Sequence, residues 1–268
     1  MDRGIKKKTF LNFVGLLRSF LIKCFIGIVL CSSIAFLYTN FIFEQILFAP
    51  KNPNFPIYIW HRSLIDFFNL SSSLYMEGID FDIQNRKMDG QLMIMIWTSF
   101  TFGLIASFPW ILYQIWKLVH PKLYNSKTRY SIVFVTITSL LFFIGVLFGY
   151  FIIVPLSIHF FMNIEISSIV ANQIDLTSYI SLVRTTILAS GIVFVLPVVI
   201  LVLYKMGILS TDTLKGYRRY AYVLILVASA IITPPDVLSQ VILVIPLVLL
   251  YEVSIFFSKF MKSNHITE

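Results

Sequence analysis

Residues 228–257 read ASAIITPPDVLSQVILVIPLVLLYEVSIFF, two apolar runs joined by the tetrapeptide Thr-Pro-Pro-Asp at 233–236. Both runs, 220–235 and 237–251, are free of charged residues. At 1.5 Å per residue each forms a helix of about 22 to 24 Å, whereas the hydrocarbon core of a bilayer is about 30 Å thick. The stretch therefore predicts a hairpin of two short membrane helices, which thin the bilayer, leave a wet recess or pair with a partner's helix.

The composition places the chain in a membrane. Of its 268 residues, 58% are apolar, 16% are aromatic and only 13% are charged, more apolar than a water-soluble domain of this size requires. Four longer charge-free runs precede the hairpin, at 24–43, 91–116, 130–158 and 185–204, and each is long enough to span a bilayer. We expect an all-α integral membrane protein with six transmembrane helices in a single domain, 1–268. The first run starts too late and is too long for a cleaved signal peptide.

The distribution of basic residues predicts the orientation. With a cytoplasmic N-terminus, the other side of the membrane holds only five of the 21 Lys and Arg, namely Lys51, Arg62, Arg86, Lys87 and Arg184. Basic residues near span ends stay in the cytoplasm, so both termini are expected there. The net charge of +8 thus indicates topology and attraction to anionic lipid rather than nucleic-acid binding.

Three segments flank the spans. Residues 1–22 have apolar residues at helical spacing and predict an amphipathic cytoplasmic lead-in that continues into the first span. Residues 44–90 form an extracytoplasmic cap loop, whose aromatic residues favour short interfacial helices. Residues 259–268 form a short cytoplasmic tail.

Prolines and glycines punctuate the spans. Four prolines inside or at the ends of spans predict kinks: Pro109, Pro155, Pro197 and Pro246. Gly145 and Gly149 form a Gly-x-x-x-Gly pair, which either allows close helix approach or is a chance match.

No catalytic, nucleotide-binding or metal-binding motif is present. The four histidines are scattered, and the sequence has neither a Gly-x-Ser-x-Gly turn nor a His-Glu-x-x-His helix. We therefore predict no enzyme activity, no metal and no cofactor. Cys24 and Cys31 lie seven residues apart on one helix, too far to bridge each other, and are interpreted as packing residues.

Polar groups in apolar surroundings are the functional candidates. Asp236 lies at the hairpin tip, where a helix N-cap role is the structural alternative. Glu252 lies at the inner end of the last run, where the alternative is an interfacial acid near Lys259. Thr233 and Gln240 lie just inside the membrane and are placed to hydrogen-bond across helices.

From about residue 10 to 260 the sequence resembles the twin-arginine translocase subunit family TatC. The resemblance is carried by FPWILYQIW at 108–116, HPKLY at 120–124, the Thr-Pro-Pro-Asp turn with Ser239-Gln240, and Tyr251-Glu252. It implies six spans with cytoplasmic termini in a cupped bundle, in the bacterial cytoplasmic (inner) membrane. It also implies a receptor and organising core for export of folded proteins driven by the proton-motive force. The implied partners are signal peptides, single-span TatA and TatB proteins, membrane lipid and further copies of the chain.

The resemblance also assigns site residues. Family members bind the arginine pair of a signal peptide with cytoplasmic glutamates, since carboxylates pair with guanidinium groups in a bidentate manner. Here Leu16 and Lys127 stand at two of these positions, and Val195 replaces a third acid in the fourth span. The surrounding signal-peptide region still matches the family at Arg18, Pro121 and Tyr124.

Away from that region the family residues are kept. Thr233, Asp236, Gln240 and Glu252 match the positions implied in partner docking and translocation, and three prolines match as structural residues, Pro50, Pro109 and Pro155. Two alternatives stay open. One is a subunit of a small-molecule transporter or permease. The other is a degenerate scaffold of the same family with weakened signal recognition.

Overall fold

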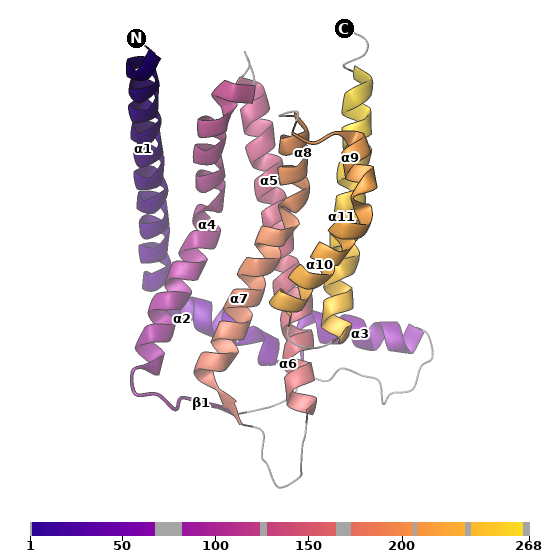
Figure 1. Ribbon diagram of the computed structural model, residues 1–268. Coiled ribbons are helices and arrows are strands. Elements are labelled where there is room, and N and C mark those ends of the chain that lie inside the picture. Colours follow the sequence, from indigo (N-terminus) through magenta and orange to yellow (C-terminus); the bar gives the residue numbers. More distant parts are fainter. Residues whose placement is uncertain are drawn as a thin grey trace. The chain divides into compact units, whose positions relative to one another are not determined.

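The protein is described by a computed structural model that covers residues 2–67, 82–123, 128–164, 173–205, 208–233 and 237–264. These residues are almost entirely helical (Figure 1). The helices are α1 (Asp2–Leu37), α2 (Thr39–Phe41), α3 (Pro56–Phe67), α4 (Gly90–Leu123), α5 (Thr128–Phe148), α6 (Val154–Asn163), α7 (Leu176–Phe194), α8 (Leu196–Lys205), α9 (Thr211–Gly216), α10 (Arg218–Ile232) and α11 (Val237–Asn264). Two short strands, β1 (Ile83–Gln84) and β2 (Ile174–Asp175), pair in parallel with Ile83 opposite Ile174.

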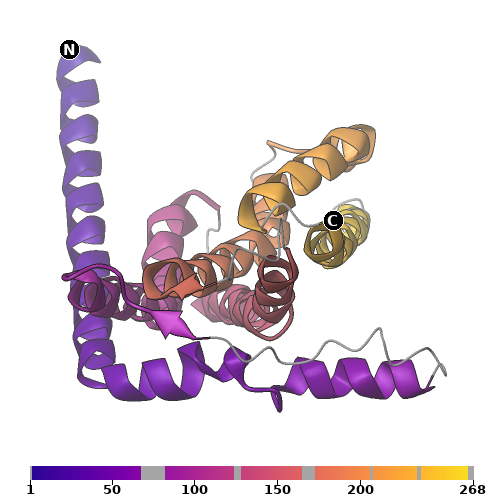
Figure 2. The same cartoon turned by 90° about the horizontal axis from the view of Figure 1, so that it is seen from below.

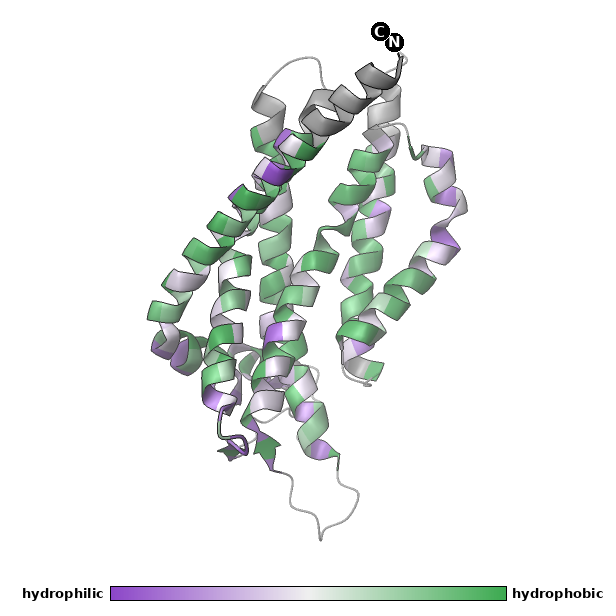
Figure 3. Ribbon diagram, turned by 60° about the vertical axis from the view of Figure 1, so that its left-hand side comes forward, coloured by the Kyte–Doolittle hydropathy of each residue, from purple (hydrophilic) through white to green (hydrophobic). Residues whose placement is uncertain are grey.

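Five helical stretches among the described residues are long and apolar enough to cross a membrane: Val14–Leu37, Gly90–Leu118, Ile132–Asn163, Leu176–Tyr204 and Ser239–Ser258. Their apolar side chains colour most of the long helices green in Figure 3, with polar residues gathered toward the helix ends. The prediction of an all-α membrane protein is confirmed. α10 has only 15 residues, about 22 Å, and is as short as predicted. The count of six spans and the orientation of the termini stay predictions.

The predicted run 24–43 belongs to a longer helix. α1 begins upstream of this run, continues through Arg18 and Lys23 and ends at Leu37. Long basic side chains keep their charge in water while their stems cover apolar surface, so they do not end the helix. The lead-in continues into this span without a break, as expected.

The last helix is longer than predicted, and the expectation that both hairpin helices are short is wrong for α11. It has 28 residues, and its apolar stretch Ser239–Ser258 spans 20, about 30 Å. The charge at Glu252 was taken as the end of the membrane run. In the structure Glu252 is paired, and the following turns pack on α9, where Ser258 Oγ lies 3.4 Å from Thr211 Oγ1.

The described residues form two compact units. Unit 1 comprises Met1–Thr39 and Met95–Leu140, and unit 2 comprises Asn40–Ile94 and Leu141–Glu268. In unit 1, α1 and α4 pack closely because Gly103 lies against Ser32, where a Cβ atom would come within 2.5 Å of the Ser32 backbone. In the same unit, Trp116 stacks on Phe134 with ring centroids 4.1 Å apart.

The core of unit 2 forms where α10 and α11 meet α9, the end of α7 and the π-helical turn Gly149–Ile153. Its buried apolar residues are Ile153, Phe194, Leu214, Ile225, Leu243, Leu247, Tyr251 and Ile255. The Gly-x-x-x-Gly pair provides the close approach that was one of its two interpretations. A Cβ at Gly145 would lie 2.7 Å from the Ser190 carbonyl oxygen, and one at Gly149 would lie 2.8 Å from Ser190 Oγ.

The segment after α1 is held by three tyrosines of unit 2. Tyr150 donates to the Ile46 carbonyl oxygen at 2.8 Å, Tyr179 to Leu47 at 2.9 Å and Tyr58 to Pro50 at 3.0 Å. Burial raises the pKa of Tyr58 to about 12, so its hydroxyl remains a donor at physiological pH. This fixes Pro50, which is fully buried.

The predicted cap loop contains the short helices that its aromatic residues suggested. α3 runs across the direction of α6 and α7 within unit 2 (Figure 1), and Figure 2 shows α3 from below. Phe55 packs edge-on against Tyr150 with centroids 5.5 Å apart. Residues 68–81 of that loop lie outside the described residues.

Two of the four span prolines coincide with breaks. Pro155 is the second residue of α6, directly after the π-helical turn, and Pro197 is the second residue of α8, after the interruption at Val195. Pro109 and Pro246 lie inside the continuous helices α4 and α11. Proline has no backbone N–H group and therefore cannot donate a helical hydrogen bond. At 155 and 197 it stands at the start of a new helix, directly after a break in the regular helix.

Replacing Gly145 by alanine is expected to lower stability by about 1 to 3 kcal/mol, because the new methyl group overlaps backbone that cannot move aside. The measurement is the thermal midpoint of the purified protein in detergent. Gly15→Ala is the matched control, since no atom lies within 4 Å of its added Cβ. Equal midpoints for the two variants would contradict the close packing of Gly145.

Candidate functional site

A polar triad joins α10 to α11. Arg218 Nη2 donates to Glu252 Oε2 at 2.6 Å, and the Tyr222 hydroxyl donates to Glu252 Oε1 at 2.5 Å. Arg218 and Tyr222 are four residues apart, so they lie on the same face of α10. Both carboxylate oxygens of Glu252 therefore have a donor from the neighbouring helix.

Sequence reasoning missed Arg218 and Tyr222 as partners of Glu252. It considered only Lys259 on the same helix. The sequence shows the spacing of residues along one helix, but it does not show which residues of two helices face each other. The side chains of Arg218 and Glu252 are 42% and 34% exposed, so the pair is neither fully solvated nor buried. Its contribution lies between the small value of a surface pair and the large one of a buried pair.

The other end of the hairpin contains Thr233 and Gln240. Gln240 Nε2 donates to the Leu226 carbonyl oxygen at 3.2 Å, which is a bond between α11 and α10. Thr233 is 5% exposed, and its hydroxyl donates to Ser229 within α10 at 2.9 Å. Asp236, the third candidate at this end, lies outside the described residues.

A cavity of about 360 Å³ lies beside the triad, between the α7–α8 break, α10 and α11. It is lined by apolar residues that include Pro197, Ile200, Leu224 and Leu247, together with Tyr251. The Tyr251 hydroxyl donates to the Leu214 carbonyl oxygen at 2.9 Å. The lining of this cavity is therefore almost entirely apolar.

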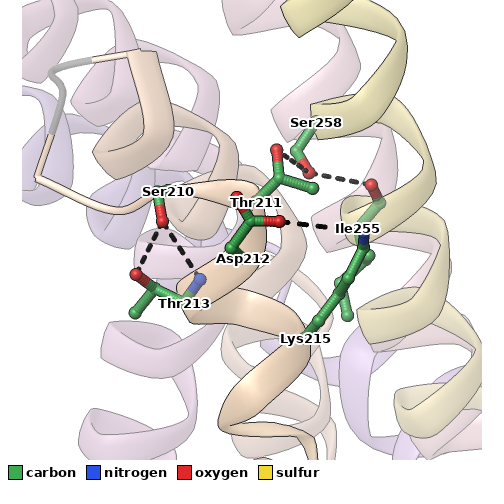
Figure 4. A network of polar contacts seen from close by, with 7 residues as sticks. All are labelled: Ser210, Thr211, Asp212, Thr213, Lys215, Ile255 and Ser258. Atoms are coloured by element: carbon green, nitrogen blue, oxygen red, sulfur yellow. Dashed lines mark hydrogen bonds and ion pairs between the residues drawn. The ribbon is translucent and has the colours of Figure 1, made fainter.

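Helix α9 supports the same end of unit 2 (Figure 4). Ser210 caps it by accepting from the Thr213 amide at 3.0 Å, a common N-cap arrangement. Lys215 and Asp212 form an exposed pair at 3.9 Å. Because α9 ends two residues before Arg218, these contacts fix the start of α10.

A second candidate surface lies in unit 1. A cavity of about 290 Å³ is formed by Leu16, Ser19, Phe20 and Lys23 of α1 with Gln114, Lys117 and Leu118 of α4. Leu16 is 62% exposed at its edge, and none of the lining residues is an acid. We refer to these seven residues as the α1–α4 groove.

The structure gathers only part of the predicted signal-peptide region. Leu16 lines the groove, and Arg18 is exposed on α1. Pro121 lies in the last turn of α4, where side chains are not described, and Tyr124 and Lys127 lie outside the described residues. Val195 occupies the interruption between α7 and α8.

Sequence reasoning did not single out Lys23, Gln114 or Lys117. The signal was present in the spacing, because residues seven apart, such as Leu16 and Lys23, share a helix face. Which face of α4 opposes it is a tertiary property.

Within the described part of the chain, no group of three or more His, Cys, Asp and Glu side chains is placed to hold a metal ion.

Residues 12–246 match the family described as "Sec-independent protein translocase protein (TatC)". The chain belongs to the TatC family. Family membership favours protein translocation over the small-molecule permease alternative.

Relatives and solved structures agree with this assignment. A TatC of Blattabacterium sp. subsp. Periplaneta americana is 38% identical over 92% of this chain and 94% of its own. A TatC of Aquifex aeolicus is 40% identical over 63% of this chain and 70% of its own. A crystal structure of the twin arginine translocase receptor TatC in DDM has a TM-score of 0.73 and 32% identity, and covers 92% of this chain and 99% of that one. The protein is thus a translocase subunit of the bacterial inner membrane.

Glu252→Gln is expected to lower stability by about 1 to 2 kcal/mol, between the values for exposed and buried pairs, because Arg218 loses its counter-charge. The double variant Arg218→Gln/Glu252→Gln should lose less than the sum of the two single losses. Thermal midpoints in detergent measure both effects. Lys215→Gln, which breaks only an exposed pair, is the control, and additive losses at Arg218 and Glu252 would show that the two side chains are not coupled.

Proposed function

We propose that this TatC-family chain is the receptor and organising core of a twin-arginine translocase. In this role it directs export of folded proteins across the bacterial inner membrane at the expense of the proton-motive force. The observation that carries the proposal is the α10–α11 hairpin. In it, Arg218 and Tyr222 bond to Glu252 and Gln240 bonds to α10. Four of its residues match the family by resemblance: Thr233, Asp236, Gln240 and Glu252.

The hairpin offers a surface for a single-span partner of the TatA or TatB type. Leu224, Val227 and Ile231 follow one another at helical spacing on α10 and are 68%, 51% and 79% exposed. α10 is also too short for an undisturbed bilayer, so a partner helix on this face would cover apolar surface where lipid fits poorly. Asp236 and Gln240 would supply polar contacts at the end of that surface, whereas the buried Thr233 would hold the end of α10 through its bond to Ser229. Further copies of the chain would assemble alongside.

A photocrosslinker placed at Ile231 should capture a TatA-type or TatB-type protein in membranes. The same probe at Ile225, which is 7% exposed, should not, because that side chain packs inside unit 2. Crosslinked bands identified by mass spectrometry measure the outcome. Capture of lipid alone at Ile231, in membranes that contain the partner, would contradict docking on this face.

Recognition of the signal peptide is proposed to occur around Leu16, Arg18, Pro121, Tyr124 and Lys127, with apolar contact replacing charge pairing. Where the family has a carboxylate, Lys127 would face the arginine of the signal peptide. The repulsion between these two positive charges would be about 4 kcal/mol at a separation of about 4 Å and an effective dielectric near 20. The site therefore favours signals that depend little on the arginine pair.

The double variant Leu16→Glu/Lys127→Glu restores two acids. It should raise the ratio of export with an Arg-Arg signal to export with a Lys-Lys signal by about tenfold or more, which is the contribution of a charge-assisted hydrogen bond. Export of a folded reporter with an Arg-Arg or a Lys-Lys signal measures this dependence. Leu17→Glu serves as control, because it adds an acid outside the groove lining. Unchanged selectivity in the double variant would place recognition elsewhere.

A scaffold that assembles without selecting cargo is the second candidate, and the absence of acids from the groove lining favours it. Export of the folded reporter in cells without their own TatC separates the two. Active export supports the receptor, whereas partner capture at Ile231 without export supports the scaffold.

A further inference from the structure

Unit 1 has an extreme charge imbalance. Its two segments, Met1–Thr39 and Met95–Leu140, contain ten Lys and Arg but a single acid, Asp2. Unit 2 contains the other twelve acids and eleven Lys and Arg, so it is nearly neutral. The basic groups of unit 1 therefore far outnumber its acids, and the excess positive charge attracts anions.

Two of these basic residues line the α1–α4 groove. Lys23 comes from α1 and Lys117 from α4, and both are exposed at the rim of the 290 Å³ cavity. Gln114, 6% exposed, adds an amide to the same lining. Ammonium and amide groups donate hydrogen bonds, so the polar part of the groove is suited to an anion.

The remainder of the groove is apolar. Leu16 and Phe20 of α1 and Leu118 of α4 complete the lining with Ser19. Both helices are membrane spans here, since Val14–Leu37 and Gly90–Leu118 are two of the apolar stretches. The groove thus combines cationic donors with apolar side chains at one end of two spans.

A tryptophan locates this end of the unit relative to the membrane surface. Trp110 Nε1 donates to the Lys23 carbonyl oxygen at 3.1 Å, and a Cβ at Gly27 would lie 2.6 Å from the Trp110 ring. Indole rings gather at the membrane interface, where lipid headgroups lie. The indole preference thus supports a position near the headgroups for this end of the groove, with Lys23 and Lys117.

We infer that the α1–α4 groove binds one anionic phospholipid, with its phosphate between Lys23 and Lys117 and an acyl chain along Leu16, Phe20 and Leu118. An acidic peptide would satisfy the lysines equally well. The lipid is favoured because the groove opens between two membrane spans and has apolar lining beside the cations. This inference goes beyond the proposed function and does not depend on it. Leu16 belongs to both proposed sites, so the lipid would occupy the groove when no signal peptide is bound.

The test is native mass spectrometry of the full-length protein in a neutral detergent, titrated with dioleoylphosphatidylglycerol or dioleoylphosphatidylcholine. Each lysine at the surface of an anionic membrane contributes about 1 kcal/mol. Lys23→Gln or Lys117→Gln should therefore lower the affinity for the first phosphatidylglycerol molecule about 5-fold, and the double variant should lower it about 25-fold. Phosphatidylcholine binding should not change.

Lys215→Gln is the matched control, because it removes an exposed lysine of unit 2 from outside the groove. The pair Lys23→Arg/Lys117→Arg keeps both charges and should bind within about twofold of the unaltered protein, which separates loss of charge from loss of fold. Wild-type affinity in the double glutamine variant would overturn the inference. An equal loss in Lys215→Gln would also overturn it, since binding would then be a diffuse effect of net charge.

Two competitors distinguish other occupants. Inorganic phosphate at matched ionic strength should leave the first phosphatidylglycerol bound, and displacement beyond a chloride control would reassign the groove to a free anion. A peptide with an Asp-Asp pair should displace the lipid no better than its Lys-Lys counterpart. Stronger displacement by the acidic peptide would reassign the groove to a protein partner and overturn the lipid.

Discussion

The carboxylate of Glu252 lies on an apolar helix, where an uncompensated charge is costly. Arg218 and Tyr222 each donate to one of its oxygens, and both come from α10, so the charge is satisfied only when α10 and α11 pack in this register. The core of unit 2, which includes Ile225, Leu247 and Ile255, is assembled around the same register. The apolar cavity beside Pro197 and the exposed face of α10 follow from it.

The short length of α10 matters because α10 is paired with a longer helix, α11. A helix of 15 residues paired with a neighbour whose apolar stretch has 20 leaves a mismatch on one side of the hairpin only. A bilayer or a partner helix must accommodate the difference. The surface around Ile231 is therefore a consequence of unequal helices, whereas the sequence suggested two equal short ones.

Charge divides between the two units in the same way as the proposed roles. Unit 2 is nearly neutral, contains the pair of Arg218 with Glu252, and carries the proposed docking face. Unit 1 has almost no acids, and its α1–α4 groove presents Lys23 and Lys117 where family resemblance led us to expect carboxylates nearby. The proposed attraction to anions and the proposed weak dependence on an arginine pair would both follow from that imbalance.

The sequence alone determined the membrane class, the approximate positions of the spans, the short α10 and the family, because apolar runs, charge spacing and local motifs are properties of consecutive residues. It erred at the inner end of α11, where Glu252 was taken as the span boundary although its carboxylate is paired with Arg218. It left open whether Gly145 and Gly149 contact another helix. Only the tertiary structure decided those points, the partners of Glu252 and the residues of the α1–α4 groove, because the rotation and register of one helix against another depend on packing between segments far apart in the chain.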